Sequence, residues 1–274
     1  MKLKSKMCMA IAAATILTGQ TVVHAEDADK PTAGVDLGVF SQYIWRGEAL
    51  SKDSLVIEPS VTLGYKGFSL NVWGNMDTDS KPWNGAKYNE TDITLSYSKD
   101  VGITKLTGGY IYYALNEQPA TPEIKASKDT QELFASVGLN VFLSPTLTVY
   151  RDIAQFPGWY VNLGISHSIP VVNKITFDLG ASASYYYSDS NSLVEAKNPN
   201  SKYRALHNGL LSAGFTIPVG EYFTVKPMIA YSFALSSEAS DFIKVNSVDG
   251  SFANGVVSGD SSYLYGGVTL SMAF

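Results

Sequence analysis

The chain has little of several residue types, and each scarcity excludes a class of chemistry or partner. Its single cysteine is Cys8, so a chain processed after residue 25 has no disulfide, no catalytic thiol and no thiolate metal site. Charged residues make up 16% of the sequence, against ~25% in ordinary globular domains. Acidic residues outnumber basic ones by 25 to 20, and this balance argues against nucleic acid as a partner.

Long hydrophobic runs are lacking as well. No stretch of ~18 apolar residues occurs, which is what a membrane-spanning helix needs. The chain nevertheless has 17 Tyr, 12 Phe and 23 Gly, and 45% of its residues are hydrophobic. High aromatic content without helical spans is typical of a transmembrane β-barrel, whose strands carry apolar residues at alternate positions.

Residues 1–25 have the features of a secretory signal peptide rather than of a folded segment. Lys2, Lys4 and Lys6 form a basic start, and residues 7–17 form an apolar core that is too short to span a bilayer. Loss of these three lysines leaves 17 basic and 25 acidic residues, a formal charge of −8. We expect residues 26–274 to form one barrel domain.

The last stretch, residues 261–274, alternates strictly between two faces. One face holds mainly aliphatic residues and ends on Phe274, and the other holds Tyr263, Tyr265 and small polar residues. A period of two over this length predicts a β-strand. An aromatic residue at the end of a closing strand fits the interfacial girdle of a membrane barrel. Phe274 also resembles the signal by which the barrel assembly machinery recognises outer-membrane barrels, so we expect that machinery as a partner.

Twelve segments have strand-like alternation. They are residues 34–46, 55–66, 68–77, 90–98, 105–115, 131–143, 146–153, 158–169, 174–187, 203–217, 222–236 and 261–274. The connections between them alternate between long polar segments and short turns. Outer-membrane barrels show this asymmetry, with short periplasmic turns and longer external loops. The pattern therefore predicts an all-β, antiparallel, twelve-stranded transmembrane barrel with both termini in the periplasm.

The second face of these strands is polar and is expected to line the lumen. The candidates for pore-lining or ligand-binding residues are Arg46, Glu58, Trp73, Asp92, Tyr160, Asp178, Tyr186 and Lys226. A soluble barrel that buries its apolar face would have the same pattern. The signal peptide and the terminal Phe274 favour the arrangement with apolar residues outside. Closure of the barrel would then satisfy every backbone hydrogen bond in lipid.

Two histidines, His167 and His207, lie beyond residue 25. A lipid-modifying barrel enzyme would need a Ser–His pair, and a same-face partner in a strand lies two residues away. At that spacing His207 has Ala205 and Gly209, and His167 has two isoleucines. A serine on a neighbouring strand keeps the enzyme open as an alternative, but we expect no enzyme and place both histidines near the membrane interfaces. The carboxylates are dispersed rather than clustered at ligand spacing, so no metal and no cofactor are expected.

Arg151 interrupts the alternation of the seventh segment. Simple alternation places it on the face of Leu147 and Val149, where an arginine at the bilayer midplane would cost ~2–4 kcal/mol. The preferred explanation is a β-bulge near Tyr150 that re-aims the side chain. The alternative is that Arg151 lies close enough to the headgroups to reach them.

The run SQYIWRG at residues 41–47, with GFSLNVW at residues 67–73, carries a family resemblance. It resembles the opening of the Gcw_chp family of exported bacterial proteins, which includes TorF-like outer-membrane proteins. The resemblance covers roughly residues 35–79, implies an outer-membrane location and supplies no reaction. On the alternation, Tyr43 and Trp45 would join the external aromatic belt. Arg46 would point into the mouth and pair with Glu48 or Glu58.

The sequence as a whole predicts a passive pore for small solutes in the outer membrane of a Gram-negative bacterium, surrounded by outer-membrane lipid and lipopolysaccharide. Acidic residues outnumber basic ones on the expected inward face, so a weak preference for cations is expected. Three alternatives remain. They are a structural or accessory outer-membrane protein, a lipid-modifying barrel enzyme and a soluble ligand-binding barrel.

Overall fold

A computed structural model describes residues 30–79, 87–115, 129–191, 193–253 and 255–274. The expected signal peptide lies outside these residues. Twelve antiparallel strands form a closed barrel in which each strand pairs with its neighbours along the chain and β1 pairs with β18. The wall strands are β1 Thr32–Phe40, β4 Val56–Tyr65, β5 Phe68–Asp77, β6 Tyr88–Val101, β7 Thr104–Leu115, β8 Thr130–Leu139, β9 Thr146–Asp152, β10 Gly158–Val172, β11 Ile175–Ser188, β14 Arg204–Val219, β15 Phe223–Ala234 and β18 Ser262–Ala273. The predicted twelve-stranded antiparallel barrel is therefore confirmed.

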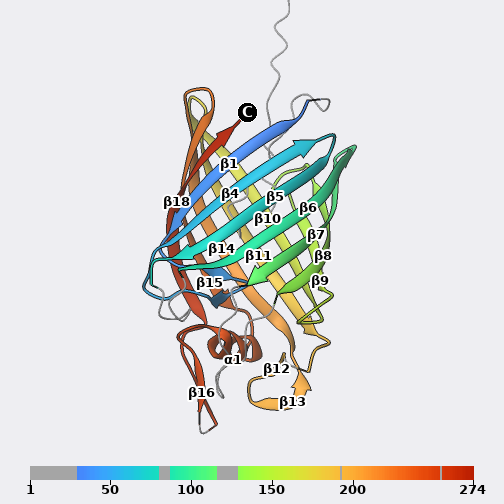
Figure 1. Ribbon diagram of the computed structural model, residues 1–274, viewed down its shortest axis with the longest axis vertical. Helices are drawn as coiled ribbons and strands as arrows, with labels where there is room; N and C mark the ends of the chain where they lie inside the picture. The colour runs from blue at the N-terminus through green and yellow to red at the C-terminus, as the bar shows by residue number, and fades with distance from the viewer. Residues whose placement is uncertain (1–29, 80–86, 116–128, 192, 254) are drawn as a thin grey trace, which may run out of the picture.

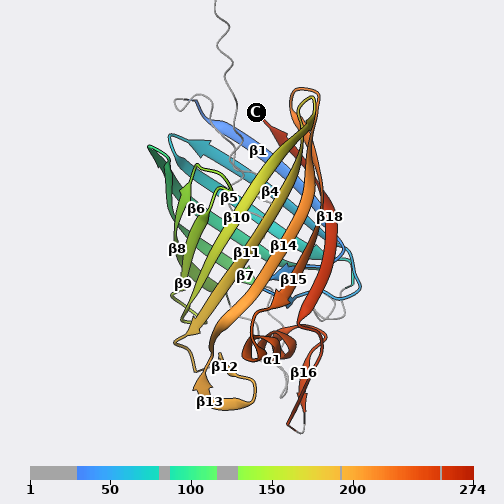
Figure 2. The same cartoon turned by 180° about the vertical axis from the view of Figure 1, so that it is seen from behind.

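The two ends of the barrel differ in their connections, as the sequence predicts. At one end, which we call the turn end, the wall strands are joined by segments of two to six residues. At the other, the loop end, most of the connections are longer. These loops carry helix α1 Ser237–Asn246 and the hairpins β2 Ile44–Trp45 with β3 Glu48–Ala49, β12 Val194–Glu195 with β13 Asn198–Lys202, and β16 Ser251–Ala253 with β17 Val256–Ser258. Figures 1 and 2 show α1 and the hairpins β12–β13 and β16–β17 at the loop end, opposite the C-terminus.

The strands alternate between an apolar outer face and a polar inner face. In β1, Val35 and Leu37 are 39% and 44% exposed on the outside, whereas Asp36 between them is 3% exposed. The same alternation runs through the neighbouring strands, because paired residues point to the same side of the sheet. Large hydrophobic side chains therefore cover the outside, and carboxylates, hydroxyls and amides face the lumen. Among the described residues, no helix is both long enough and apolar enough to cross a membrane.

The closing strand pairs in register with the first. Val35, Leu37 and Val39 of β1 lie opposite aliphatic residues of β18. Phe274 donates its backbone N–H to the carbonyl oxygen of Ala33 at 2.8 Å and accepts from the Ala33 N–H at 3.2 Å. Its ring is exposed at the turn end and stacks on Tyr222, with ring centroids 6.2 Å apart. This position is the one expected for a girdle aromatic.

The first strand is shorter than predicted. β1 ends at Phe40, and residues 41–55 turn into the lumen instead of continuing the wall. The placement of Tyr43 and Trp45 in an external aromatic belt was therefore wrong. Tyr43 is 7% exposed and packs inside the barrel against Trp73, with ring centroids 5.6 Å apart. A short lumen-filling hairpin shows the same alternation as a wall strand, which is why the pattern misled.

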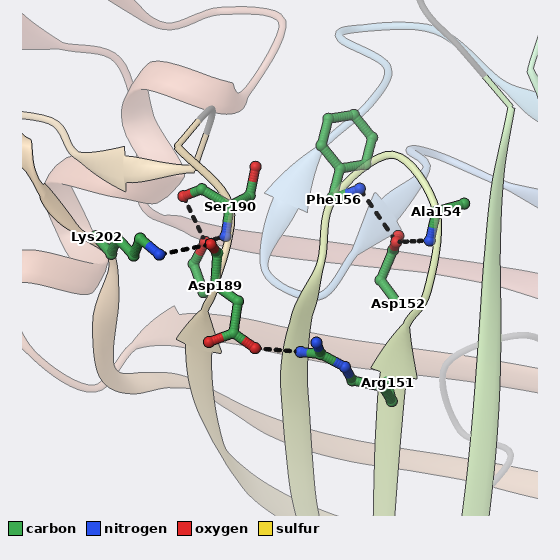
Figure 3. Close-up of polar contacts among 8 residues, drawn as sticks. Arg151, Asp152, Ala154, Phe156, Asp189, Ser190 and Lys202 are labelled. Atoms are coloured by element: carbon green, nitrogen blue, oxygen red, sulfur yellow. Dashed lines mark hydrogen bonds and ion pairs between the residues drawn. The ribbon is translucent and has the colours of Figure 1, made fainter.

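Arg151 is not re-aimed by a bulge. Both partners of β9 keep an unbroken register through it, and Arg151 lies opposite Leu133 and Trp159 on the outer face. The bulge prediction was therefore wrong, and the alternative position near the loop end of the wall is the observed one. Figure 3 shows Arg151 extending from β9 to Asp189, which follows β11, and forming an ion pair with it.

The difference between the two ends predicts how the barrel is oriented in a cell. Val256 in the β16–β17 hairpin and Lys174 in the β10–β11 turn are both exposed and lie at opposite ends. After removal of Cys8, a cysteine introduced as Val256→Cys should react with a membrane-impermeant thiol reagent on intact cells, and Lys174→Cys should react only after lysis. Labelling of Lys174→Cys alone on intact cells would mean that the turn end faces outward.

Candidate functional site

Residues 41–55 fill the lumen at the loop end, helix α1 covers them at the mouth, and we call these two segments the plug. The contacts of residues 41–55 come from all around the wall. Tyr43 packs on Trp73 of β5, and Ile44 clusters with Leu210 of β14 and Tyr265 of β18. Arg46 contacts Glu132 of β8, Tyr150 of β9 and Tyr160 of β10. A segment that touches strands on every side of a closed barrel lies inside it.

The tip of the β2–β3 hairpin is a two-residue turn. Ile44 pairs with Ala49 and Trp45 pairs with Glu48, which leaves Arg46 and Gly47 between the strands. Both have positive φ, 49° and 89°, as a type I′ turn requires. Glycine adopts this conformation readily, whereas arginine seldom does. The contacts of the Arg46 side chain and carbonyl therefore help to hold the turn in place.

Arg46 forms a buried, bidentate ion pair with Glu132 of β8. Its two terminal nitrogens donate to Glu132 Oε1 at 2.8 Å and Oε2 at 2.6 Å, and the two residues are 5% and 3% exposed. Tyr113 of β7 donates to the same carboxylate at 2.9 Å. The sequence predicted Glu48 or Glu58 as the partner of Arg46, and that prediction was wrong. The partner lies 86 residues away and is brought close by closure of the barrel.

Three aromatic rings surround the Arg46 guanidinium. Its Cζ lies 4.4 Å from the ring centroid of Trp45, 5.0 Å from that of Tyr150 and 4.3 Å from that of Tyr160. Cation–π contacts of this kind are worth ~2 kcal/mol or more where the site is desolvated. Tyr150 and Tyr160 lie opposite each other on β9 and β10, so these two strands form the aromatic side of the arginine site.

His207 connects the hairpin to the wall and to α1. It is fully buried, with Nδ1 2.7 Å from the Tyr203 hydroxyl and Nε2 2.8 Å from the Arg46 carbonyl oxygen. Because a carbonyl oxygen only accepts, Nε2 carries the proton and the Tyr203 hydroxyl donates to Nδ1. His207 therefore lies inside the barrel, next to Leu206, which pairs with Tyr185 on the outer face. His167 lies on the outside near the turn end, with its ring 5.1 Å from that of Phe142.

A bulge in β14 places both His207 and Asn208 inside. The register with β11 shifts between Ala183 and Tyr185, and His207 and Asn208 are 0% and 2% exposed. The Asn208 side-chain oxygen accepts from the hydroxyls of Tyr160 at 2.9 Å and Ser184 at 2.7 Å. An extra residue in the strand lets two polar side chains support the plug where simple alternation would provide one.

Helix α1 begins with an N-cap at Ser236, whose side chain accepts from the Ala239 N–H at 3.1 Å. Its apolar face is Ala239, Phe242 and Ile243. Phe242 stacks on Tyr203, with ring centroids 3.9 Å apart and an interplanar angle of 20°. The spacing of these apolar residues, together with the capping serine, was the sequence signal that could have identified this helix.

The helix is also hydrogen-bonded to the hairpin. The Ala49 N–H donates to the Ser247 hydroxyl oxygen at 2.9 Å, and the Val248 N–H donates to the Ala49 carbonyl oxygen at 2.9 Å. Within residues 41–55, the Leu50 N–H donates a further hydrogen bond to the Tyr43 carbonyl oxygen at 2.8 Å. The two segments are nearly 200 residues apart in the chain, yet these bonds make them one unit.

The predicted site residues all face the lumen, but the structure divides them into three groups. Tyr160 and Tyr186 surround the Arg46 and His207 sites. Glu58, Trp73 and Asp92 lie beside Tyr43 on the opposite wall, where Trp73 pairs with Asp92 across β5 and β6. Asp178 and Lys226 line a cavity towards the turn end. Sequence reasoning left Glu132, Tyr203 and Asn208 off the list of candidates, because their roles depend on the plug.

A cavity of about 210 Å³ lies between the plug and the turn end of the lumen. Tyr43 and Ile44 of the plug form one side, and Glu58, Asp178 and Lys226 add charge to the lining. Asp178 is held by Thr176, which donates to Oδ1 at 2.9 Å, and by Thr216, which donates to Oδ2 at 2.7 Å. Among the described residues no group of three or more His, Cys, Asp and Glu side chains is arranged to hold a metal ion.

No protein-family model matches the chain, and no curated protein matches it. Solved structures resemble it over most of its length. OmpT, an outer membrane protein of Vibrio cholerae, is 9% identical, with 93% of this chain and 100% of that chain covered and a TM-score of 0.41. A Pseudomonas aeruginosa FadL homologue is 11% identical, with 90% of each chain covered and a TM-score of 0.38. An anion-selective porin from Comamonas acidovorans is 12% identical, with 89% and 99% covered and a TM-score of 0.35. Likenesses this weak carry no argument about function.

The buried ion pair predicts how the plug responds to loss of one charge. Removal of one partner of a buried pair costs ~3–5 kcal/mol, so in Glu132→Gln the unpaired Arg46 should draw the hairpin out of the lumen. Trypsin cleavage after Arg46 should then be faster by roughly 100-fold or more, since cleavage follows the population of the open form. The cleavage rate is measured by mass spectrometry of the fragments from folded protein in detergent.

Cleavage after Lys197 in the β12–β13 hairpin, whose side chain is 62% exposed and which lies outside the plug, provides an internal reference in the same digest. The matched control is Glu221→Gln, an equal change at an exposed position of the turn end. Equal resistance of the Arg46–Gly47 bond in wild type and Glu132→Gln would show that the ion pair does not hold the plug.

Proposed function

We propose that this protein is an outer-membrane barrel of a Gram-negative bacterium. The outer surface supports this proposal, because exposed hydrophobic side chains surround the barrel and the polar side chains face inward. Exposed aromatic residues mark both ends of that surface, including Trp159 and Tyr185 near the loop end and Tyr222 and Phe274 at the turn end. Aromatic girdles of this kind sit at the two membrane interfaces. In lipid, the closed hydrogen-bonded ladder leaves no strand edge exposed.

Within that membrane, we propose that the barrel is a narrow pore for small solutes whose loop-end mouth is closed by the plug in the described state. The observation that carries the proposal is the charged cavity that remains beneath the plug. The plug adds no strand to the barrel wall and is held there by side-chain contacts and a few hydrogen bonds. Its displacement would therefore open the lumen without breaking the barrel.

The charges of the lumen support a weak preference for cations. The wall strands present the acidic residues Asp36, Glu58, Asp77, Glu90, Asp92, Glu132, Asp152 and Asp178 to it, and the basic residue Lys226. The plug hairpin adds one residue of each sign, Arg46 and Glu48. Acidic rings in a narrow pore favour cations. Lys66 does not add to the basic residues of the lumen, because it lies in the exposed β4–β5 turn, with its ammonium group 5.3 Å from the Tyr65 ring centroid.

A second candidate is a structural or accessory barrel that conducts nothing. The extent of the plug favours it, because Tyr203, His207 and Ile243 at the loop end are fully buried. A catalytic role receives less support, since both ring nitrogens of His207 are engaged by Tyr203 and by the Arg46 carbonyl rather than by a serine. We also propose membership of the Gcw_chp family, and residues 41–47, which carry that resemblance, fall within the plug.

Conductance across a planar lipid bilayer distinguishes the two candidates. Wild-type protein should show rare, small openings, and Glu132→Gln should raise the open fraction at least tenfold, because loss of the ion pair releases the plug. In a KCl gradient the reversal potential of the open state should indicate modest cation preference, strongest at low salt because screening grows with ionic strength.

Glu221→Gln serves again as the control and should conduct like wild type. If Glu132→Gln makes the Arg46–Gly47 bond sensitive to trypsin but still produces no current, the pore proposal is wrong and the accessory barrel remains. An anion-selective reversal potential would contradict the assigned role of the lumen carboxylates.

A further inference from the structure

A row of arginine and aromatic side chains crosses the outer surface near the loop end. Cross-strand pairing aligns Arg151, Trp159, Tyr187 and Arg204 on the neighbouring strands β9, β10, β11 and β14. Trp159 is 42% exposed, and the residues on either side of it in β10 are buried. The row therefore lies outside the barrel, where a membrane interface would meet it.

Each arginine of the row is stacked on an aromatic ring. The Cζ of Arg151 lies 5.0 Å from the ring centroid of Trp159, and the Cζ of Arg204 lies 4.8 Å from that of Tyr187. Stacking uses the flat face of a guanidinium and leaves its N–H edge available for a planar or tetrahedral oxyanion. The two arginines are thus positioned before any ligand arrives.

Together with its neighbours Lys202 and Asp189, the row has more positive than negative charge. Arg151 is ion-paired with Asp189, and Lys202 donates to the Asp189 carbonyl oxygen at 2.7 Å (Figure 3). The hydrogen bond from Arg151 lowers the pKa of Asp189, so this carboxylate is charged at neutral pH. Arg204 is exposed and has no ion pair among the described residues. Three cationic groups therefore face one carboxylate.

The surface next to the row is apolar on the side of the turn end. The adjoining row of outward positions consists of Val149, Val161, Tyr185 and Leu206 on the same four strands. A cationic edge above an apolar face matches a molecule with an anionic head and hydrocarbon chains. A free phosphate ion would contact only the cationic residues and would not contact the apolar row.

We propose that Arg151, Arg204 and Lys202 bind the phosphate group of an anionic lipid in the loop-side leaflet, with its acyl chains along the apolar row. The inference rests on the proposed membrane location but does not depend on conduction through the lumen. Arg204, which has no ion pair among the described residues, donates two N–H groups to the phosphate oxygens. Arg151 donates both to Asp189 and to the phosphate. The site is a lipid-binding one and involves no covalent step.

Native mass spectrometry of the folded protein in detergent, with added dioleoylphosphatidic acid or dioleoylphosphatidylcholine, tests this site. Wild-type protein should retain one phosphatidic acid at a concentration about tenfold or more below that needed for phosphatidylcholine. Arg204→Gln should raise the concentration for phosphatidic acid by about tenfold, the size expected for a charge-assisted hydrogen bond. Asp189→Asn should lower it, because the competing carboxylate is gone.

The matched control is Lys174→Gln, which removes one positive charge at the turn end and should leave retention unchanged. Heat-modifiable migration in gels confirms that each variant is folded. Equal retention of both lipids by wild type, or equal retention of phosphatidic acid by wild type and Arg204→Gln, would overturn the proposal. Displacement of phosphatidic acid by inorganic phosphate at a similar concentration would overturn the assignment to a lipid. A barrel that retains phosphatidic acid but shows no current would leave this site intact and contradict only the pore.

Discussion

The arrangement of the lumen depends on the ion pair between Arg46 and Glu132. A barrel of twelve strands is wider than the eight-stranded barrels that wall side chains can fill, and this chain fills the loop end with its own residues 41–55 and α1. An arginine placed there is costly unless its charge is paired and its donors are bonded. Glu132 provides two acceptors, and Trp45, Tyr150 and Tyr160 provide the aromatic surround. The position of Glu132 on β8 therefore determines how far the β2–β3 hairpin extends into the lumen.

A chain of contacts that starts at Arg46 connects the hairpin to helix α1. The Arg46 carbonyl binds His207, His207 binds Tyr203, and Tyr203 stacks on Phe242 of α1. The same kind of contact, an arginine over an aromatic ring, recurs outside the barrel at Arg151 and Arg204, where the surroundings differ. Inside, the guanidinium of Arg46 is ion-paired with Glu132 through two hydrogen bonds and connects the hairpin to the wall. Outside, one guanidinium lacks an acidic partner and is available to a ligand.

The wall of the barrel was predictable because period-two alternation and the alternation of connection lengths are local features of the chain. The plug was not, for physical reasons. Tyr43 and Trp45 continue the alternation of β1, so nothing local separates a wall strand from a hairpin that turns inward at Ser41. The partner of Arg46 depends on closure of the barrel, which brings together residues 86 positions apart. The candidate residues of the wall face inward, whereas Arg46 reaches the lumen from the plug hairpin. Their grouping depends on the plug and could not be read from spacing.

Hydrogen exchange of the backbone amides of Ala49, Leu50 and Val248 in the folded protein tests the plug most directly. These amides bond to the Ser247 hydroxyl and to the carbonyls of Tyr43 and Ala49 inside the lumen. They should exchange slowly in wild type and become faster together in Arg46→Ala, while the strands of the wall remain unchanged. Exchange in wild type as fast as that of an unfolded peptide would contradict a lumen closed by residues 41–55 and α1.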